Sequence, residues 1–216
     1  MKGSRGWRLS MARLAATLSA VLMTMLMTGA AAAQAVPGTT AVQSASIDIA
    51  VTYDALHTNH LTAQEFWMQG GAVEIGARLY RGLGVAARVE GLHAGASSAN
   101  GEPLSLVTAV FGPRYTFQTR GRRYAIFGEA LGGESNGFHS LFSTGSGPVG
   151  SVNAGTTSSA NALAVDIGGG MDVRLNRHFA VRVFRASYLR TQFPNTTTNV
   201  QNSLSLSAGL VVRLGR

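Results

Sequence analysis

Polar and apolar side chains alternate with a period of two in eight segments of the sequence. Successive residues of a β-strand point to opposite faces, so this pattern predicts strands with one apolar and one polar face. The segment 203–213 is the clearest, because leucines at even positions alternate with Ser203, Ser205 and Ser207. We therefore expect an all-β chain of antiparallel strands joined by hairpins. The eight segments are residues 46–54, 67–80, 83–90, 104–117, 124–133, 161–174, 179–190 and 203–213.

The ionisable residues of these segments share the small or polar face of their strands. A soluble β-sandwich buries its apolar face and exposes charge to water, whereas a membrane barrel turns the apolar face to lipid and keeps charge inside. Arg185 breaks the pattern by falling on the apolar face, and we expect a β-bulge near Phe184 that restores it. The residues on the polar face are Asp48, Asp54, Glu74, Arg78, Arg88, Glu90, Arg114, Glu129, Asp166, Asp172, Arg182 and Arg213.

Short and long connections alternate between the predicted strands. The short turns are Arg81-Gly82, 118–123 and 175–178, and they separate four longer polar connections. Eight strands with three short turns and four long loops are typical of a closed membrane barrel. The connection 134–159 is rich in Gly, Ser, Thr and Asn without periodicity, which predicts a long, mobile loop.

Aromatic residues fall near the ends of the predicted strands, as expected of the girdles at a membrane interface. Four lie beside the short turns and two near the opposite ends. They are Tyr115, Phe117, Tyr124 and Phe179, followed by Tyr53 and Trp67.

Residues 1–35 have the three parts of a secretory signal peptide. Lys2 and three arginines precede an apolar stretch over residues 14–27, and Ala33-Gln34-Ala35 forms an A-x-A cleavage site. The apolar stretch is shorter than the roughly 20 residues needed to cross a bilayer as a helix. We expect cleavage after Ala35, which leaves residues 36–216 as one barrel domain.

Composition narrows the classes of protein that remain. The sequence has no cysteine, so no disulfide can stabilise the exported chain. No apolar run in residues 36–216 reaches 18 residues, which excludes helical membrane spans there. The formal net charge is +8, but the signal peptide carries half of it, and export makes nucleic acid a poor partner.

Four short motifs stand out, at residues 111–115, 168–173, 177–182 and 202–215. They resemble the OmpA-type eight-stranded outer-membrane β-barrels, particularly the small porin-family members. The resemblance implies a Gram-negative outer-membrane protein with short periplasmic turns, longer extracellular loops and a monomeric state. The partners it implies are outer-membrane lipids, lipopolysaccharide and the outer-membrane assembly machinery.

The leading hypothesis is a structural or surface-interaction barrel whose lumen is filled by charged side chains. Eight strands enclose an interior just wide enough for side chains to fill, and buried charges must be paired. Gly168, Gly169 and Gly170 are interpreted as small residues that make room for neighbouring arginines. We expect no enzymatic activity and no cofactor. The expected lumen network is Glu74, Arg78, Arg88, Glu90, Arg114, Glu129, Asp166, Asp172, Arg182 and Arg213.

Three alternatives remain open at this stage. The barrel could be a narrow ion-conducting pore, or the loop 134–159 could bind a ligand. It could also be a lipid A-modifying acyl hydrolase or transferase that uses Glu134, His139 and Ser140, because a serine nucleophile needs an adjacent base and an orienting acid. His57, His60 and His93 lack the spacing of metal ligands, so no metal site is expected.

Overall fold

The computed structural model describes residues 46–58, 65–95, 103–119, 121, 123–143, 156–194 and 200–214. These residues form eight antiparallel strands, which confirms the predicted fold class. The expected signal peptide, residues 1–35, lies outside the described residues. No helix in the described ranges is long and apolar enough to cross a bilayer. The strands are β1 (Ser46–Thr58), β2 (Phe66–Tyr80), β3 (Leu83–Ala94), β4 (Leu104–Gln118), β5 (Tyr124–Ser143), β6 (Thr156–Arg174), β7 (Phe179–Thr191) and β8 (Gln201–Leu214).

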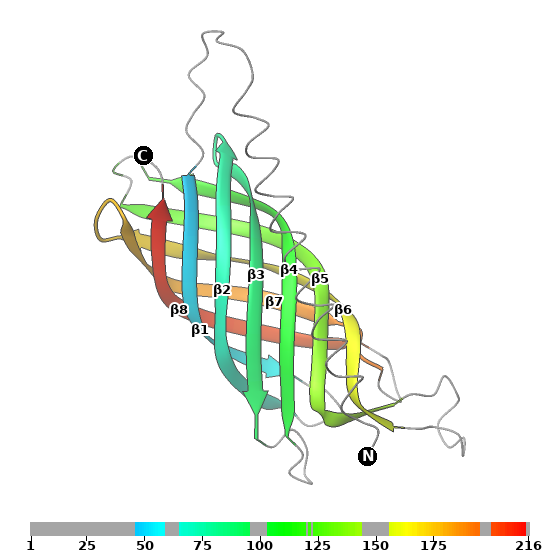
Figure 1. The fold of residues 1–216 in the computed structure, drawn as a ribbon. Helices are drawn as coiled ribbons and strands as arrows, with labels where there is room; N and C mark the ends of the chain where they lie inside the picture. The colour runs from blue at the N-terminus through cyan, green and yellow to red at the C-terminus, as the bar shows by residue number, and fades with distance from the viewer. Residues whose placement is uncertain are drawn as a thin grey trace. The chain divides into compact units, whose positions relative to one another are not determined.

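The sheet closes on itself. Each strand pairs with its neighbour in the sequence, and β8 pairs with β1 from Ile47↔Leu214 to His57↔Leu204 (Figure 1). Closure gives the wall no free edge, so its backbone N–H and C=O groups are satisfied within the sheet.

The two faces of the wall have the reverse of the polarity found in soluble proteins. Large hydrophobic side chains point outward on every strand, and Val51 and Leu210 are 58% and 63% exposed. Most arginine, aspartate and glutamate side chains of the strands point inward and are buried, whereas Glu134 and Arg190 are exposed. The period-two pattern of the sequence therefore assigns the faces correctly for most of each strand.

The predicted turn at Arg81-Gly82 is present and tight. Both residues have positive φ, 44° at Arg81 and 90° at Gly82, as two-residue hairpin loops of type I′ require. A side chain at Gly82 would place its Cβ 2.5 Å from the carbonyl oxygen of Thr116. The turn is held against β4 at this point, because the amide of Thr116 donates to the Gly82 carbonyl at 2.7 Å.

The prediction of a loop over residues 134–159 is wrong at both ends. β5 continues to Ser143, and β6 begins at Thr156, so only residues 144–155 remain between them and lie outside the described residues. Backbone pairing runs as far as Ser143↔Thr156. Hydrophobic alternation fails to mark these strand ends because small and polar residues dominate both faces there.

The expected bulge in β7 is confirmed. Arg182 pairs with Gly209 of β8 and Arg185 with Ser207, so Val183 and Phe184 together face a single residue. Both are exposed on the outer face, while Arg182 and Arg185 on either side are 1% exposed inside the barrel. The extra residue thus directs two arginines into the lumen.

Deleting Val183 tests this assignment. The deletion restores strict alternation and keeps both arginines inward, so we expect refolding and a free energy of unfolding close to those of the parent. Deleting Ala186, an outward residue of the same strand, would turn Ser187, Leu189 and Thr191 to the wrong face and should abolish folding. Urea titration in detergent micelles measures both, and equal losses in the two variants would contradict the bulge.

Candidate functional site

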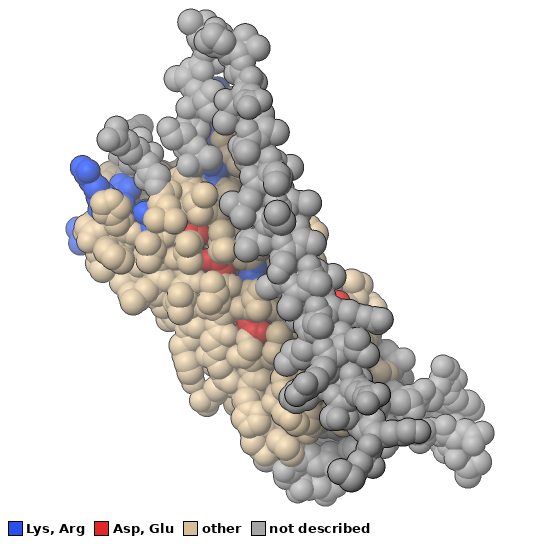
Figure 2. Space-filling view, in the orientation of Figure 1, with Lys and Arg blue, Asp and Glu red and all other residues tan. Residues whose placement is uncertain are grey.

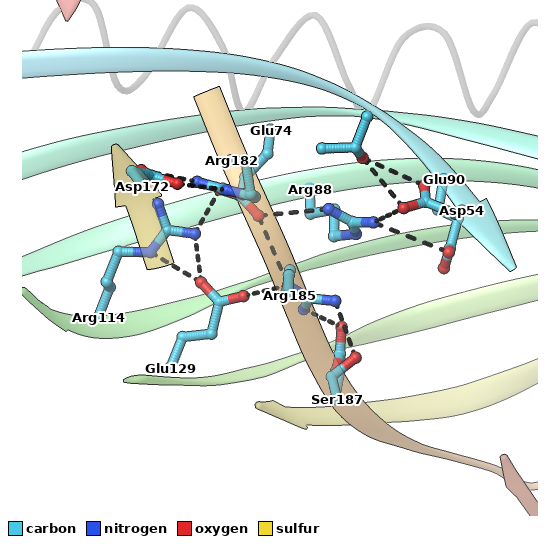
Figure 3. A network of polar contacts seen from close by, with 12 residues as sticks. Asp54, Glu74, Arg88, Glu90, Arg114, Glu129, Asp172, Arg182, Arg185 and Ser187 are labelled. Atoms are coloured by element: carbon cyan, nitrogen blue, oxygen red, sulfur yellow. Dashed lines mark hydrogen bonds and ion pairs between the residues drawn. The ribbon is translucent and has the colours of Figure 1, made fainter. Parts of the chain in front are cut away.

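Ten ionisable side chains from seven strands meet inside the barrel (Figure 3). Each is at most 7% exposed, and we call this set the lumen network. Six are acids and four are arginines. The members are Asp54, Glu74, Arg88, Glu90, Arg114, Glu129, Asp166, Asp172, Arg182 and Arg185.

Glu74 of β2 is the centre of the lumen network, because its carboxylate faces all four arginines. Oε1 lies 2.6 Å from Nη1 of Arg182 and 2.5 Å from Nη2 of Arg114. Oε2 lies 3.4 Å from Nη1 of Arg88 and 3.8 Å from Nε of Arg185. One carboxylate thus links strands that do not pair with one another, β2 and β7 among them.

Every arginine of the lumen network has at least one further carboxylate. Asp172 accepts from Nε of Arg182 at 2.9 Å, and Asp166 accepts from Nη2 of Arg185 at 2.6 Å. Glu129 of β5 pairs with both Arg114 of β4 and Arg185 of β7. Arg88 is bound in the same way by Asp54 at 2.8 Å.

Glu90 is the most weakly held acid of the lumen network. Its Oε1 is 3.8 Å from Nη2 of Arg88, and that oxygen has no hydrogen-bond partner among the described residues. Six carboxylates for four guanidinium groups leave an excess of acid here, and Glu90 carries the least compensation for it.

Phe127 packs between the charged groups and shapes the space around them. The guanidinium carbons of Arg114 and Arg182 lie 4.5 and 4.4 Å from its ring centroid, within the range of cation–π contacts. A Cβ at Gly170 would lie 2.9 Å from this ring, and one at Gly76 would lie 2.8 Å from Nη1 of Arg114. Small residues in the wall thus make room for the large side chains inside.

Two of the residues predicted for this network, Arg78 and Arg213, lie apart from it. They are near the end of the barrel that carries the three short turns, which we call the short-turn end. Arg78 Nη2 is 3.5 Å from Oδ2 of Asp48, and Arg213 Nε is 3.6 Å from Oδ1. No ion pair within the described ranges joins this group to Glu74. The structure therefore brings eight of the ten predicted residues together and separates the other two.

A cluster of apolar side chains fills the lumen between the lumen network and the opposite end of the barrel. We call this the long-connection end, because the longer connections between strands lie there. Gln201 helps to fix it, because its side-chain amide bonds both the N–H and the carbonyl of Phe193, at 2.8 and 3.1 Å. A cavity of about 10 Å³ remains there, about the space of one water molecule. We call this cluster the apolar plug; its larger members are Leu56, Met68, Leu92, Leu104, Leu106, Leu131, Phe142, Leu189 and Phe193.

Sequence reasoning did not place Arg185 or Asp54 in the predicted network and missed the apolar plug. For Arg185 the signal was present, because the expected bulge turns it inward. Asp54 was already assigned to the polar face. The plug gives a weaker signal: Leu104 and Leu106 are inward-facing and apolar, which departs from the pattern of small or polar inward residues.

The candidate catalytic residues do not assemble into a triad. Glu134 is exposed on the outer face, and the Ser140 side chain lies outside the described residues. His139 Nδ1 is 3.3 Å from Oγ of Ser105, which His93 Nδ1 approaches to 2.9 Å. In the described part of the chain, no carboxylate pairs with either imidazole.

His57 and His60 are the other histidines that the sequence analysis considered as metal ligands. His57 lies 3.4 Å from Glu65 and stacks near Trp67, with ring centroids 4.8 Å apart. His60 lies outside the described residues. Among the residues with described positions, no three potential ligands gather around one point.

The predicted girdle residues all project from the outer surface. Tyr80, beside the Arg81-Gly82 turn, and Tyr188, near the opposite end, are exposed in the same way and were not predicted. The six predicted residues found exposed are Tyr53, Trp67, Tyr115, Phe117, Tyr124 and Phe179.

Comparison with solved structures identifies this architecture. Neisserial surface protein A matches with a TM-score of 0.53 and 14% sequence identity, over 77% of this chain and 96% of that chain. The chain has the fold of the small outer-membrane barrels. At this identity the match concerns the fold alone, and it confirms the resemblance predicted from the sequence.

Two further structures match with lower scores. Ail, the attachment invasion locus protein of Yersinia pestis, has a TM-score of 0.49 at 14% identity, over 79% of this chain and 98% of that one. The N-terminal barrel of OprF from Pseudomonas aeruginosa has a TM-score of 0.39 at 15% identity, over 78% and 97%. No protein-family model and no curated protein matches the sequence.

Replacing Glu74 by Gln should destabilise the barrel far more than replacing Glu90 by Gln. Glu74→Gln removes the negative charge that four buried arginines share, and breaking such buried pairs costs about 3–5 kcal/mol. Glu90→Gln removes an acid that is in excess and keeps its shape. Urea unfolding of the two refolded variants measures the difference, and a similar loss in both would refute the central role of Glu74.

Proposed function

We propose that this protein is a barrel of the bacterial outer membrane with a structural or surface-interaction role, and that its lumen is closed by side chains. The observation that carries the proposal is the combination of an apolar outer wall with a filled interior. Such a wall is stable in contact with lipid, and such an interior leaves the outer surface and the strand ends for any partner.

The dimensions of the apolar surface support insertion in a membrane. On β8 the outward apolar residues run from Leu204 to Leu214. At about 3.3 Å per residue and a tilt of about 40°, this run covers roughly 25 Å along the barrel axis, the usual height of the apolar band.

Polar residues bound this band at the long-connection end. Outward-facing hydrogen bonds join Tyr53 to Gln69 at 2.8 Å and Tyr188 to Asn202 at 2.5 Å. The neighbouring strands β5 and β6 carry the bonded pair Asn136 and Asn161 at a similar place. Tyrosines with amide partners fit the boundary between acyl chains and headgroups.

The filled lumen favours a structural role over the other functions considered. A pore needs a continuous aqueous path, but here the charged layer is followed by the apolar plug. An acyl hydrolase needs an acid behind its histidine, and neither His93 nor His139 has one in the described residues. The partners that we propose are outer-membrane lipids, lipopolysaccharide and the assembly machinery, with the protein as a monomer.

Expression of the full chain in a Gram-negative host tests location and fold together. We expect the protein in the outer-membrane fraction, with the intact mass of residues 36–216. It should migrate differently on gels before and after heating. A water-soluble monomer in the periplasm that unfolds cooperatively without detergent would overturn the proposal.

Planar bilayer recordings test the closed lumen. We expect no single-channel steps from the purified barrel, because ions cannot cross the apolar plug and the paired charges beneath it. A 16-stranded porin, which leaves an aqueous channel, serves as the positive control. Reproducible steps would assign the alternative function, a narrow pore.

A further inference from the structure

The three short turns each carry an arginine outside the lumen. Arg81 lies in the turn between β2 and β3, Arg123 immediately precedes β5, and Arg177 lies between β6 and β7. All three are exposed, and we call them the arginine rim. Figure 2 shows blue side chains gathered at this end of the barrel. The sequence places Arg120 and Arg122 in the same turn as Arg123.

The arginine rim has no acidic counterpart on the outer surface of the described residues. Among the described residues, only Glu65 and Glu134 are acids outside the lumen. Both lie toward the long-connection end, away from the arginine rim. Inside the barrel mouth at the short-turn end, Arg78 and Arg213 share the single carboxylate of Asp48. The described residues at this end of the barrel therefore carry an excess of positive charge.

Aromatic neighbours place two of the three arginines of the rim at the level of a membrane interface. The guanidinium carbon of Arg81 lies 5.2 Å from the Tyr80 ring centroid, and that of Arg123 lies 5.9 Å from the Tyr124 ring centroid. Exposed tyrosines mark the headgroup region of a bilayer. Guanidinium groups stacked beside them reach the depth of the lipid phosphates, and they match phosphate oxygens with a two-pronged fork.

We propose that the arginine rim binds the phosphate groups of anionic phospholipids in the leaflet that surrounds the short-turn end. This inference rests on the proposed function, because it requires the barrel to be inserted in a membrane. Each arginine near an anionic membrane surface strengthens binding to that surface by about fivefold. Three of them should therefore select anionic lipid from a zwitterionic background.

Tryptophan quenching by brominated lipids tests the proposal. Trp67 is the only tryptophan of residues 36–216 and lies near the long-connection end. The variant Trp67→Phe/Phe179→Trp moves the reporter next to the arginine rim. Both proteins are reconstituted in phosphatidylcholine vesicles that contain 20 mol% of brominated phosphatidylglycerol or, in parallel, of brominated phosphatidylcholine, on the order of one charge in five lipids.

We expect the reporter at position 179 to be quenched at least about threefold more effectively by the brominated anionic lipid than by the zwitterionic one. Trp67 should show no preference. In the reporter background, Arg81→Gln/Arg123→Gln/Arg177→Gln should remove the preference, and high salt should reduce it. The matched control Arg190→Gln changes an exposed arginine at the opposite end of β7 and should leave the preference intact.

The outcomes separate this inference from the function on which it rests. Failure to insert, seen as unchanged migration on heating, contradicts the proposed function and the inference together. Insertion with equal quenching by both lipids overturns the inference alone, as does a preference that survives the triple substitution. Saturable binding of soluble polyglutamate without lipid preference would assign the arginine rim to an acidic periplasmic partner and overturn the lipid assignment.

Discussion

Pairing of buried arginines with carboxylates is the constraint on which the rest of the structure depends. The four arginines of the lumen network are at most 7% exposed, so an unpaired guanidinium there would be costly. Glu74 meets this requirement for four arginines at once, and Glu129 and three aspartates supply the remaining partners. Hydrogen bonds of the sheet join only neighbouring strands, whereas these ion pairs cross the lumen.

The filled interior leaves only the outside of the barrel for interactions with partners. Any interaction with a partner must use the outer wall, the turns or the strand ends, because the cavity described inside the lumen has room for only about one water molecule. The apolar band, the polar residues at one boundary and the arginine rim at the other divide that outer surface into three chemically distinct zones. The proposed function and the lipid inference follow from this zoning.

Alternation predicted the fold because successive residues of each strand face the apolar outer surface and the packed interior in turn. The faces of Glu74, Arg114 and Asp172 could be assigned in this way, and the bulge that rescues Arg185 could be placed within two residues. The ends of β5 and β6 could not, since outside the apolar band neither face demands a hydrophobic residue. Nor could the apolar plug be foreseen, because period two says which face a leucine such as Leu106 occupies but not how densely the lumen packs.

The ion pair between Arg182 and Glu74 has a consequence for assembly, because it joins β7 to β2 across 108 residues of sequence. A sheet that had entered the membrane before its first and last strands met would hold these opposite charges apart and turn them toward acyl chains. Glu74 can still pair with Arg88 of the adjacent strand β3, and Arg182 with Asp172 of β6, but the pair between β2 and β7 forms only when the barrel closes. On this view the buried charges act as a penalty on every open intermediate, so that only the completed cylinder is stable in the bilayer.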